Sequence, residues 1–295
     1  MPDGVTSPRV GQLEGQLREI CEQLAATLRL CDPSEDDERV SHAVDQLLAV
    51  VSNAVGHEPG ADVDEYGRAR GGSPLQLQLY VNLFPGELES AICASLPDLA
   101  ARRPSFEWIS PVAADRYRTY RQGGFLAALG LEQLEPKLEA FWPERGPRWD
   151  GLARLHFADG EPPGVLLVEA KSHVSELTGE PCEAVEASRR RIEQRLTGIA
   201  SRFGILEVPA CWLEDCYQYI NRLAHLFFLR DQGVDAWLVH LYFAGDWDKP
   251  TSEDAWRRAI ETLRHRMGLP AASIRRAADI VLPAKKLLAL SLPIR

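Results

Sequence analysis

The sequence has little that would suit a secreted, membrane-spanning or disulfide-stabilised protein. Its N-terminus shows neither the basic start nor the apolar stretch of a secretion signal. No apolar run approaches the roughly 18–20 residues that a bilayer-spanning helix needs. The six cysteines include no CxxC pair and no His-plus-Cys cluster at zinc spacing, so we interpret them as reduced thiols. We therefore expect a cytoplasmic protein without membrane contacts.

Several catalytic motifs are also missing. The sequence contains no GxxxxGK[ST] phosphate loop, no GxGxxG turn, no GxSxG elbow and no HExxH helix. These absences argue against a P-loop NTPase, a dinucleotide-dependent dehydrogenase, a serine hydrolase and a zinc protease. The chemistry has to come from another arrangement.

Positive charge is scarce, and its distribution is uneven. The net charge is −10, whereas a duplex-binding surface is usually basic. Residues 1–100 hold 17 acidic and 6 basic side chains, while residues 251–295 hold 4 acidic and 9 basic ones. The acidity is therefore concentrated in the N-terminal third, and the total charge does not exclude a nucleic-acid partner for the remainder.

The chain divides by pattern into an acidic extension, residues 1–74, and an α/β domain, residues 75–295. In the extension we expect two helices, 8–31 and 36–55, followed by a Gly-rich linker, 56–74. The helices suit a packing element, a homodimer contact or a contact with a partner protein. In the domain, alternating and apolar runs predict strands at 75–83, 106–109, 151–157, 165–171, 236–243 and 279–282. Helical patterns fall at 85–96, 112–141, 183–203, 210–230 and 252–268. The order predicts a mixed central sheet flanked by helices.

The strand at 165–171 carries two charges at its end. Successive strand residues alternate faces, so Glu169 and Lys171 point to the same side. If the connection to strand 151–157 centres on Glu161, Asp150 lies across from about residue 172, beside Lys171. Two carboxylates and an ammonium then converge. Asp150 and Glu169 can hold Mg²⁺ through oxygen ligands, and Lys171 can orient an attacking water or stabilise charge on a phosphate.

These residues resemble a known family. Trp149-Asp150-Gly151, a turn, and Val165-Leu166-Leu167-Val168-Glu169-Ala170-Lys171 look like the PD-(D/E)xK superfamily of restriction-endonuclease-like nucleases. The resemblance covers roughly residues 130–245, although the proline of the motif does not directly precede Asp150. It implies a restriction-endonuclease-like core, Mg²⁺ (or Mn²⁺) dependence, a nucleic-acid substrate that we expect to be DNA, and hydrolysis by an endo- or exonuclease.

Two other interpretations stay open. In one, Glu169 and Lys171 form a salt bridge and Asp150 is a turn residue of a structural α/β protein. Alternatively, the chain is a catalytically inactive nuclease-fold module that binds nucleic acid or a partner protein.

Five further side chains are candidate nucleic-acid contacts. The helix at 183–203 follows the catalytic strand and carries Arg189 and Arg190, which suit a phosphate backbone. The opposing interpretation is a solvated helix face paired with acidic neighbours. On the helix at 210–230, the side opposite the apolar stripe carries Gln218, Asn221 and Arg222. In the exonuclease branch of the family, a Gln is followed four residues later by a Tyr. Here Arg222 follows Gln218, so that motif is not matched.

Overall fold

The computed structural model divides the chain into two units, Met1–Asp62 and Val63–Arg295. It describes residues 63–295 except 65, 144–145, 159–160, 180, 183, 248, 271–273, 288–291 and 294–295. The expected helices at 8–31 and 36–55, and residues 56–62 of the expected linker, lie outside the described residues. In the rest of that segment, Val63 forms a bridge with Ala69 and helix α3 already begins at Gly72.

The helices and strands of the described unit follow one another as an α/β fold. The helices are α3 (Gly72–Leu83), α4 (Pro85–Ser95), α5 (Pro97–Ala100), α6 (Gln122–Leu129), α7 (Glu135–Phe141), α8 (Glu186–Arg202), α9 (Tyr217–Asp231) and α10 (Glu253–Arg266). The 3₁₀ helices are η1 (Ala113–Asp115), η2 (Glu132–Leu134), η4 (Val174–Glu176) and η5 (Ala210–Trp212). The strands are β1 (Ser105–Ser110), β2 (Tyr120–Arg121), β3 (Arg148–Trp149), β4 (Gly151–His156), β5 (Gly164–Lys171), β6 (Ala236–Ala244) and β7 (Ala277–Pro283).

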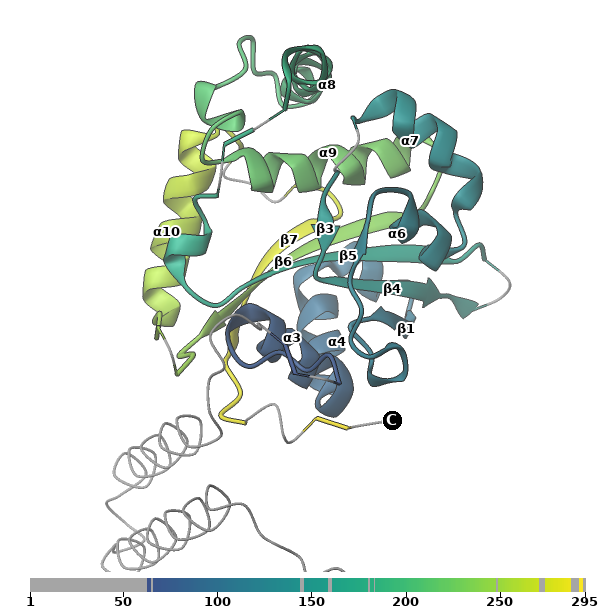
Figure 1. The fold of residues 1–295 in the computed structure, drawn as a ribbon, viewed down its shortest axis with the longest axis vertical. Helices are drawn as coiled ribbons and strands as arrows, with labels where there is room; N and C mark the ends of the chain where they lie inside the picture. The colour runs from purple at the N-terminus through teal and green to yellow at the C-terminus, as the bar shows by residue number, and fades with distance from the viewer. Residues whose placement is uncertain are drawn as a thin grey trace, which may run out of the picture. The chain divides into compact units, whose positions relative to one another are not determined.

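A mixed five-stranded sheet with helices on both faces forms the centre, as the sequence predicts (Figure 1). Its order is β1-β4-β5-β6-β7. The β1–β4 and β4–β5 pairs are antiparallel, whereas β5–β6 and β6–β7 are parallel. A short separate ladder joins β2 and β3. None of the helices in the described part of the chain has the length and apolar character needed to cross a bilayer.

The alternation of side chains along β5 explains the two core layers. Val165 and Leu167 contribute to a large apolar cluster with residues of α6–α10. Leu166, Val168 and Ala170 point the other way, into a second cluster with α3, α4 and α5. Burial of both faces explains why β5 and β6 are almost continuously apolar. The same alternation places Glu169 and Lys171 on the face that α9 covers.

The expected strand at 75–83 is wrong, because this segment is helix α3. Alternating leucines in a helix lie about 200° apart, so they form two rows of residues spaced by four. Leu75 and Leu79 pack into a third small cluster, and Leu77 packs into the cluster beneath β5. The helix is therefore buried on two sides, and a pattern with a period of two arises without a strand.

The glutamines between these leucines are buried and hydrogen-bonded to backbone. The Gln76 side chain accepts from the Lys285 amide and donates to the Lys285 carbonyl, at 2.7 and 3.1 Å. The Gln78 side chain accepts from the Ala69 amide and donates to the Gly67 carbonyl, at 2.8 and 3.1 Å. Positions that an alternating strand would expose are instead satisfied inside the fold.

Two expected helices are shorter than their patterns suggest. The stretch 112–141 contains η1, β2, α6, η2 and α7, and α6 ends at Leu129, followed by Gly130 with a φ of 75° as a left-handed cap. The stretch 210–230 begins with η5, which inserts the Trp212 ring into the core and lets its indole donate to the Met267 carbonyl at 3.0 Å. The helix proper, α9, starts only at Tyr217. The other expected strands and helices are confirmed within a few residues.

Candidate functional site

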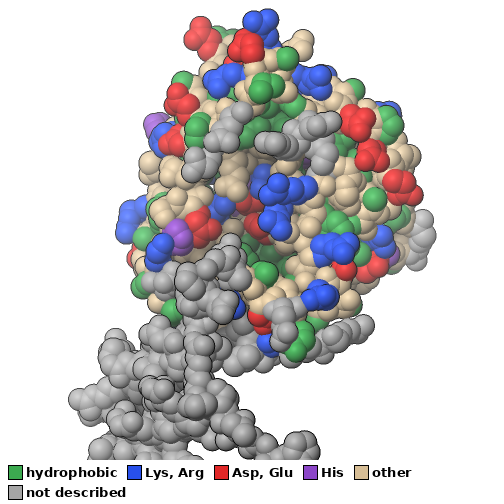
Figure 2. All heavy atoms as spheres, in the orientation of Figure 1, with side chains coloured by type: hydrophobic (Ala, Val, Ile, Leu, Met, Phe, Trp, Pro, Cys, Tyr) green, Lys and Arg blue, Asp and Glu red, His purple; other side chains and the backbone are tan. Residues whose placement is uncertain are grey.

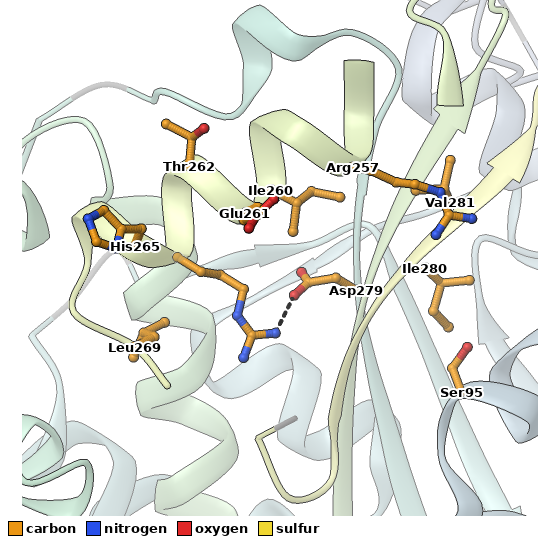
Figure 3. A pocket seen from close by; sticks show the side chains of 11 residues that line it. Ser95, Arg257, Ile260, Glu261, Thr262, His265, Leu269, Asp279, Ile280 and Val281 are labelled. Atoms are coloured by element: carbon orange, nitrogen blue, oxygen red, sulfur yellow. Dashed lines mark hydrogen bonds and ion pairs between the residues drawn. The ribbon is translucent and has the colours of Figure 1, made fainter. Parts of the chain in front are cut away.

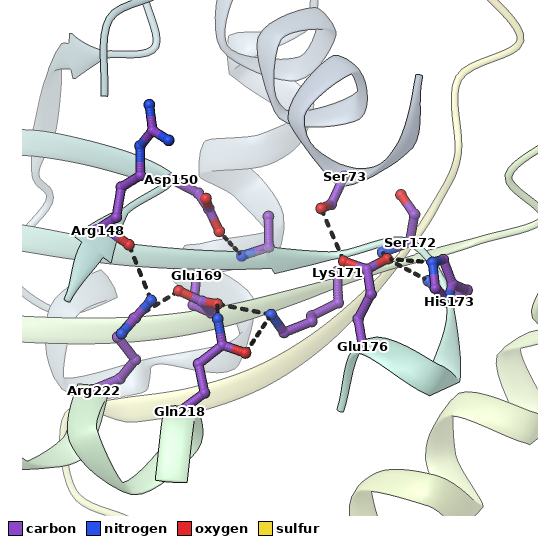
Figure 4. A network of polar contacts seen from close by, with 11 residues as sticks. Ser73, Arg148, Asp150, Glu169, Lys171, Ser172, His173, Glu176, Gln218 and Arg222 are labelled. Atoms are coloured by element: carbon purple, nitrogen blue, oxygen red, sulfur yellow. Dashed lines mark hydrogen bonds and ion pairs between the residues drawn. The ribbon is translucent and has the colours of Figure 1, made fainter. Parts of the chain in front are cut away.

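The β4–β5 hairpin brings Asp150 next to Glu169. Gly151 pairs with Val168, so Asp150, one residue before β4, falls beside Glu169 and Ala170. The Asp150 carboxylate accepts a hydrogen bond from the Ala170 amide at 2.8 Å (Figure 4). The expected alignment with residue 172 is therefore wrong by about three positions.

The error in register comes from Phe157, which we expected to continue the first strand. The strand ends at His156, and Phe157 turns away so that its ring lies 5.9 Å from the Trp237 ring. The guanidinium of Arg102 lies over the Phe157 ring, 3.5 Å from the ring centroid. The ladder closes at the Leu155–Gly164 pair, so the connection centres one and a half residues before Glu161, and the register moves by three positions.

Glu169 is buried, and its carboxylate is held by three side chains (Figure 4). One oxygen accepts from the Lys171 ammonium at 2.9 Å and from the Gln218 amide at 2.7 Å. The other oxygen accepts from Nε of Arg222 at 2.6 Å. A carboxylate offers about four acceptor positions, so one position on the Arg222-bound oxygen remains after these bonds.

Lys171 is fixed from two sides. Its Nζ donates to Glu169 and to the side-chain oxygen of Gln218, both at 2.9 Å. Only 12% of the Lys171 side chain is exposed. An ammonium has three N–H groups, so one donor remains for a water or an anion at the end of β5.

The site shifts the pKa values of the two carboxylates in opposite directions. Loss of solvent around Asp150, together with the charge of Glu169, raises the pKa of Asp150 to about 7. Burial also acts to raise the pKa of Glu169, but the charges and hydrogen bonds of Arg222 and Lys171 outweigh it and hold that pKa below its usual value. The site thus combines an ionised Glu169 with an Asp150 whose charge is poorly compensated near neutral pH.

Helix α9 supplies the side chains that complete the site. Gln218 and Arg222 are four residues apart, so they lie on one side of the helix and both reach Glu169. Arg222 also donates to the Arg148 carbonyl at 3.0 Å and lies 5.2 Å from the centroid of the Trp149 ring. The structure brings these two candidate residues to the trio, while Asn221 is buried beside them. Their contact with nucleic acid stays a prediction.

Arg189 and Arg190 are not brought to the trio by any described contact. Arg189 pairs with Glu193 at 3.2 Å, and Arg190 pairs with Glu186 at 2.8 Å. Both pairs lie within α8, which packs on α9 on the side away from the sheet (Figure 1). These pairs match the solvated-face interpretation, and a role in binding nucleic acid stays a prediction.

A row of polar residues crosses the sheet from the site. Glu169 pairs in register with His240 on β6, and His240 pairs with Asp279 on β7. His240 stacks on Tyr219 of α9 with ring centroids 4.1 Å apart, and burial lowers its pKa to about 4. Asp279 accepts from the hydroxyls of Tyr219 and Tyr242 and pairs with Arg264 at 3.2 Å. No local pattern predicts this row, since its members come from separate strands and helices.

Two cavities flank this row. The larger, about 900 Å³, is lined by residues of α10 and β7, among them Arg264 and Asp279, which pair at 3.2 Å. Figure 3 shows Asp279 of β7 across from α10. The smaller, about 540 Å³, is lined by Gln218, Asn221 and Arg222 of α9 and by Arg121 and Arg148 of the β2–β3 ladder. In Figure 2, Lys and Arg side chains gather beside a hollow in the middle of the face where Figure 1 draws β3 and α9. Sequence reasoning missed Arg121 and Arg148, because nothing local indicates that they meet.

Within the part of the chain that the structure describes, no group of three or more His, Cys, Asp or Glu side chains lies close enough together to hold a metal ion. The donor set of the site is therefore limited to the two carboxylates. Comparison with known proteins adds no assignment: no family model, no curated protein and no solved structure matches this chain.

Proposed function

We propose that this protein is a metal-dependent nuclease of the restriction-endonuclease-like PD-(D/E)xK type, which hydrolyses phosphodiester bonds in DNA or RNA. The observation that carries the proposal is the convergence of Asp150, Glu169 and Lys171 at the end of an otherwise apolar strand. A raised pKa at Asp150 supports it, because a carboxylate next to another carboxylate gains when a cation compensates both. The mixed sheet and the helices on its two faces are compatible with a restriction-endonuclease-like core.

The donor set fits Mg²⁺. This ion is commonly bound through one or two carboxylates, with water and substrate phosphate oxygens as its remaining ligands. Asp150 uses one carboxylate oxygen for the Ala170 amide, and Glu169 has one acceptor position left. Asp150 and Glu169 would hold the ion, and Mn²⁺ suits the same oxygen donors. When bound, the ion lowers the pKa of a coordinated water and stabilises charge on the phosphate.

The protein's own groups contribute positioning and charge. Glu169 and Gln218 fix the Lys171 ammonium, which leaves one N–H free to orient an attacking water or to donate to a phosphate oxygen. Arg222 keeps Glu169 ionised. Because these groups are held before substrate arrives, little reorganisation is needed during the reaction.

The proposal is tested by cleavage assays on single- and double-stranded DNA and RNA with Mg²⁺, Mn²⁺ or EDTA. Asp150→Asn removes a negative ligand with little change in shape, and Lys171→Ala removes the positioned ammonium. Each should lower the rate on the order of 10²–10³-fold, as does loss of one catalytic electrostatic contact. Arg257→Gln is the matched control, since Arg257 is exposed and paired with Glu253 on α10. Cleavage by Lys171→Ala at the wild-type rate would sink the mechanism.

A second candidate is a nuclease-fold module without catalysis. The Arg222–Glu169 ion pair favours it, because Arg222 already supplies a positive charge to the carboxylate that a metal would use. The two candidates differ in a Mg²⁺ titration followed by thermal melting. The nuclease should gain stability with Mg²⁺ in wild type and lose that gain in Asp150→Asn. The inactive module should show the same small response in both.

A further inference from the structure

Two arginines face each other across the β2–β3 ladder. Arg121 and Arg148 are register partners, and both are exposed. Like charges directly opposite one another in an antiparallel pair destabilise it. The arrangement therefore costs stability unless an anion lies between or beside the two guanidinium groups.

The described protein does not supply that anion. Arg148 donates through Nε to the Thr119 hydroxyl at 2.7 Å, and neither Arg121 nor Arg148 pairs with a carboxylate among the described residues. Carboxylates are not in short supply, since the chain has 43 acidic against 33 basic side chains. Other arginines near the sheet are paired, as Arg154 is with Glu107 at 3.2 Å.

The pair borders the cavity of about 540 Å³ next to the trio. Buried Asn221 and Arg222 also line this cavity, so it is recessed below the surface. Its volume lies in the range of about 300–1,000 Å³ that is typical of small-molecule pockets, which suits one nucleotide unit. A base can enter such a recess only after it leaves a duplex stack.

The backbone connects the pair directly to the trio. Arg148 is two residues before Asp150, and its carbonyl accepts from Arg222, which in turn binds Glu169. An anion between the two arginines would therefore lie beside the site where a phosphodiester is cut. Paired guanidinium groups suit a phosphate because each can donate two parallel hydrogen bonds to its oxygens.

We propose that Arg121 and Arg148 together bind one phosphate of the substrate strand, and that the cavity beside them receives the unpaired nucleotide attached to it. The substrate class is then single-stranded nucleic acid or an unpaired strand end. This inference rests on the proposed nuclease function and adds the form of substrate that the site accepts.

The test is the binding of a fluorescein-labelled ten-nucleotide DNA strand to the full chain in EDTA, followed by anisotropy. Arg121→Gln and Arg148→Gln should each weaken binding about tenfold, as expected for a lost charged hydrogen bond. In the double variant, the slope of log affinity against log salt should fall by about 0.7, which is the value for one phosphate on a single strand. Arg257→Gln makes the same charge change on α10 and should bind like wild type.

The structure also predicts the stability of these variants. Because they relieve repulsion between exposed like charges, they should melt at the wild-type temperature or slightly above it. A blunt duplex of the same sequence should compete at least ten times more weakly than the single strand. Wild-type affinity in the double variant would overturn the phosphate-binding pair, and equal competition by the duplex would overturn the unpaired nucleotide.

Failure of the phosphate-binding pair and failure of the nuclease proposal give different results. Binding in EDTA needs no catalysis, so the affinity of the two arginine variants is measured separately from their cleavage rate, with Arg257→Gln as the control in both measurements. Strand binding that depends on both arginines, without any metal-dependent cleavage, would keep the phosphate site and remove the nuclease. Cleavage that depends on Lys171 but not on either arginine would keep the nuclease and remove the phosphate site.

Discussion

Two carboxylate centres, one at Glu169 and one at Asp279, lie at opposite ends of one row across the sheet. They differ in the hydrogen-bond donors that surround them. At the Asp279 end, two tyrosine hydroxyls and Arg264 bind a single carboxylate, and the neighbour on β6 is His240. Burial lowers the pKa of His240 to about 4, so it is neutral near pH 7. At the Glu169 end, the neighbour is a second carboxylate, Asp150, whose pKa is raised to about 7.

The difference separates a structural centre from a candidate catalytic one. A buried carboxylate with a full set of donors stabilises the fold and has no further need of a cation. A pair of carboxylates in which one lacks sufficient donors costs stability in the free protein, and binding of a cation recovers it.

The largest expected effect is on the free energy of unfolding of Arg222→Leu. This change leaves Glu169 buried without its strongest partner, since only 6% and 3% of the two side chains are exposed. Loss of one partner of a buried ion pair costs about 3–5 kcal/mol. Urea unfolding followed by circular dichroism measures it. Arg264→Leu is the matched variant, and it should cost about 1–3 kcal/mol because both tyrosine hydroxyls still bind Asp279. Equal losses would show that the two centres are alike.

The second effect concerns pH. The folded protein raises the pKa of Asp150 from 3.8 to about 7, so it binds this proton more tightly than the unfolded chain does. The ionisation of Asp150 therefore costs stability progressively from about pH 4 to pH 7. Asp150→Asn removes this cost, so its free energy of unfolding should exceed that of wild type by on the order of 4 kcal/mol above pH 7.

The excess stability of Asp150→Asn should shrink below pH 4 and should also shrink when Mg²⁺ is added. Unfolding measured at several pH values in EDTA checks the first point. Asp279→Asn serves as the contrast and should lower stability at neutral pH, because it weakens the bonds to two hydroxyls and Arg264. If Asp150→Asn is less stable than wild type at pH 8, Asp150 does not lack donors, and the difference between the two centres is contradicted.

A smaller effect is expected from Gln218→Leu, which removes a hydrogen-bond partner of Lys171 and of Glu169. Because Gln218 only positions Lys171 and Glu169, its loss should lower kcat about 10–100-fold with little change in KM. At the other centre, Tyr242→Phe removes one donor to Asp279 and should cost about 1 kcal/mol of stability. Its cleavage rate should equal that of wild type, and a large decrease would mean that the Asp279 centre contributes to catalysis.

The smallest effect is expected from Arg190→Gln. Arg190 is exposed and pairs with Glu186 one helical turn away, which stabilises a helix by about 0.2–0.5 kcal/mol. We expect the affinity for a single strand to fall less than about twofold, since this guanidinium already has an internal partner. A tenfold loss would instead support the α8 surface as a nucleic-acid contact.

Local patterns were sufficient to predict β4, β5 and β6 as strands and to bring Asp150, Glu169 and Lys171 to one end of the hairpin, although the register was wrong by about three positions. The catalytic role of the trio stays a prediction. In these segments the alternation, the apolar runs and the turn residues all reflect contacts between near neighbours. Segment 75–83 failed because leucines with a period of two can also cover two sides of a buried helix. The pattern alone contains no information on which of these surroundings the segment meets.

The contacts that distinguish the site were beyond sequence reasoning for a related physical reason. Arg222 reaches Glu169 from α9, and Arg121 meets Arg148 through a ladder of two residues per strand. Both depend on where distant segments pack. Gln218 and Arg222 were found as candidates from helical spacing, but the spacing could not show that they bind Glu169.

The glutamines of α3 bear on where this unit can be cut. Each amide group binds both an N–H and a C=O, so it takes the place of a neighbouring backbone residue. Gln78 joins α3 to Gly67 and Ala69, and Gln76 joins it to Lys285 near the other end of the unit. The segments around Gly67 and around Lys285 are therefore both hydrogen-bonded to helix α3. A fragment that starts at residue 75 lacks Gly67 and Ala69, so the Gln78 amide loses both of its partners. A cut at this position therefore removes a packed part of the unit.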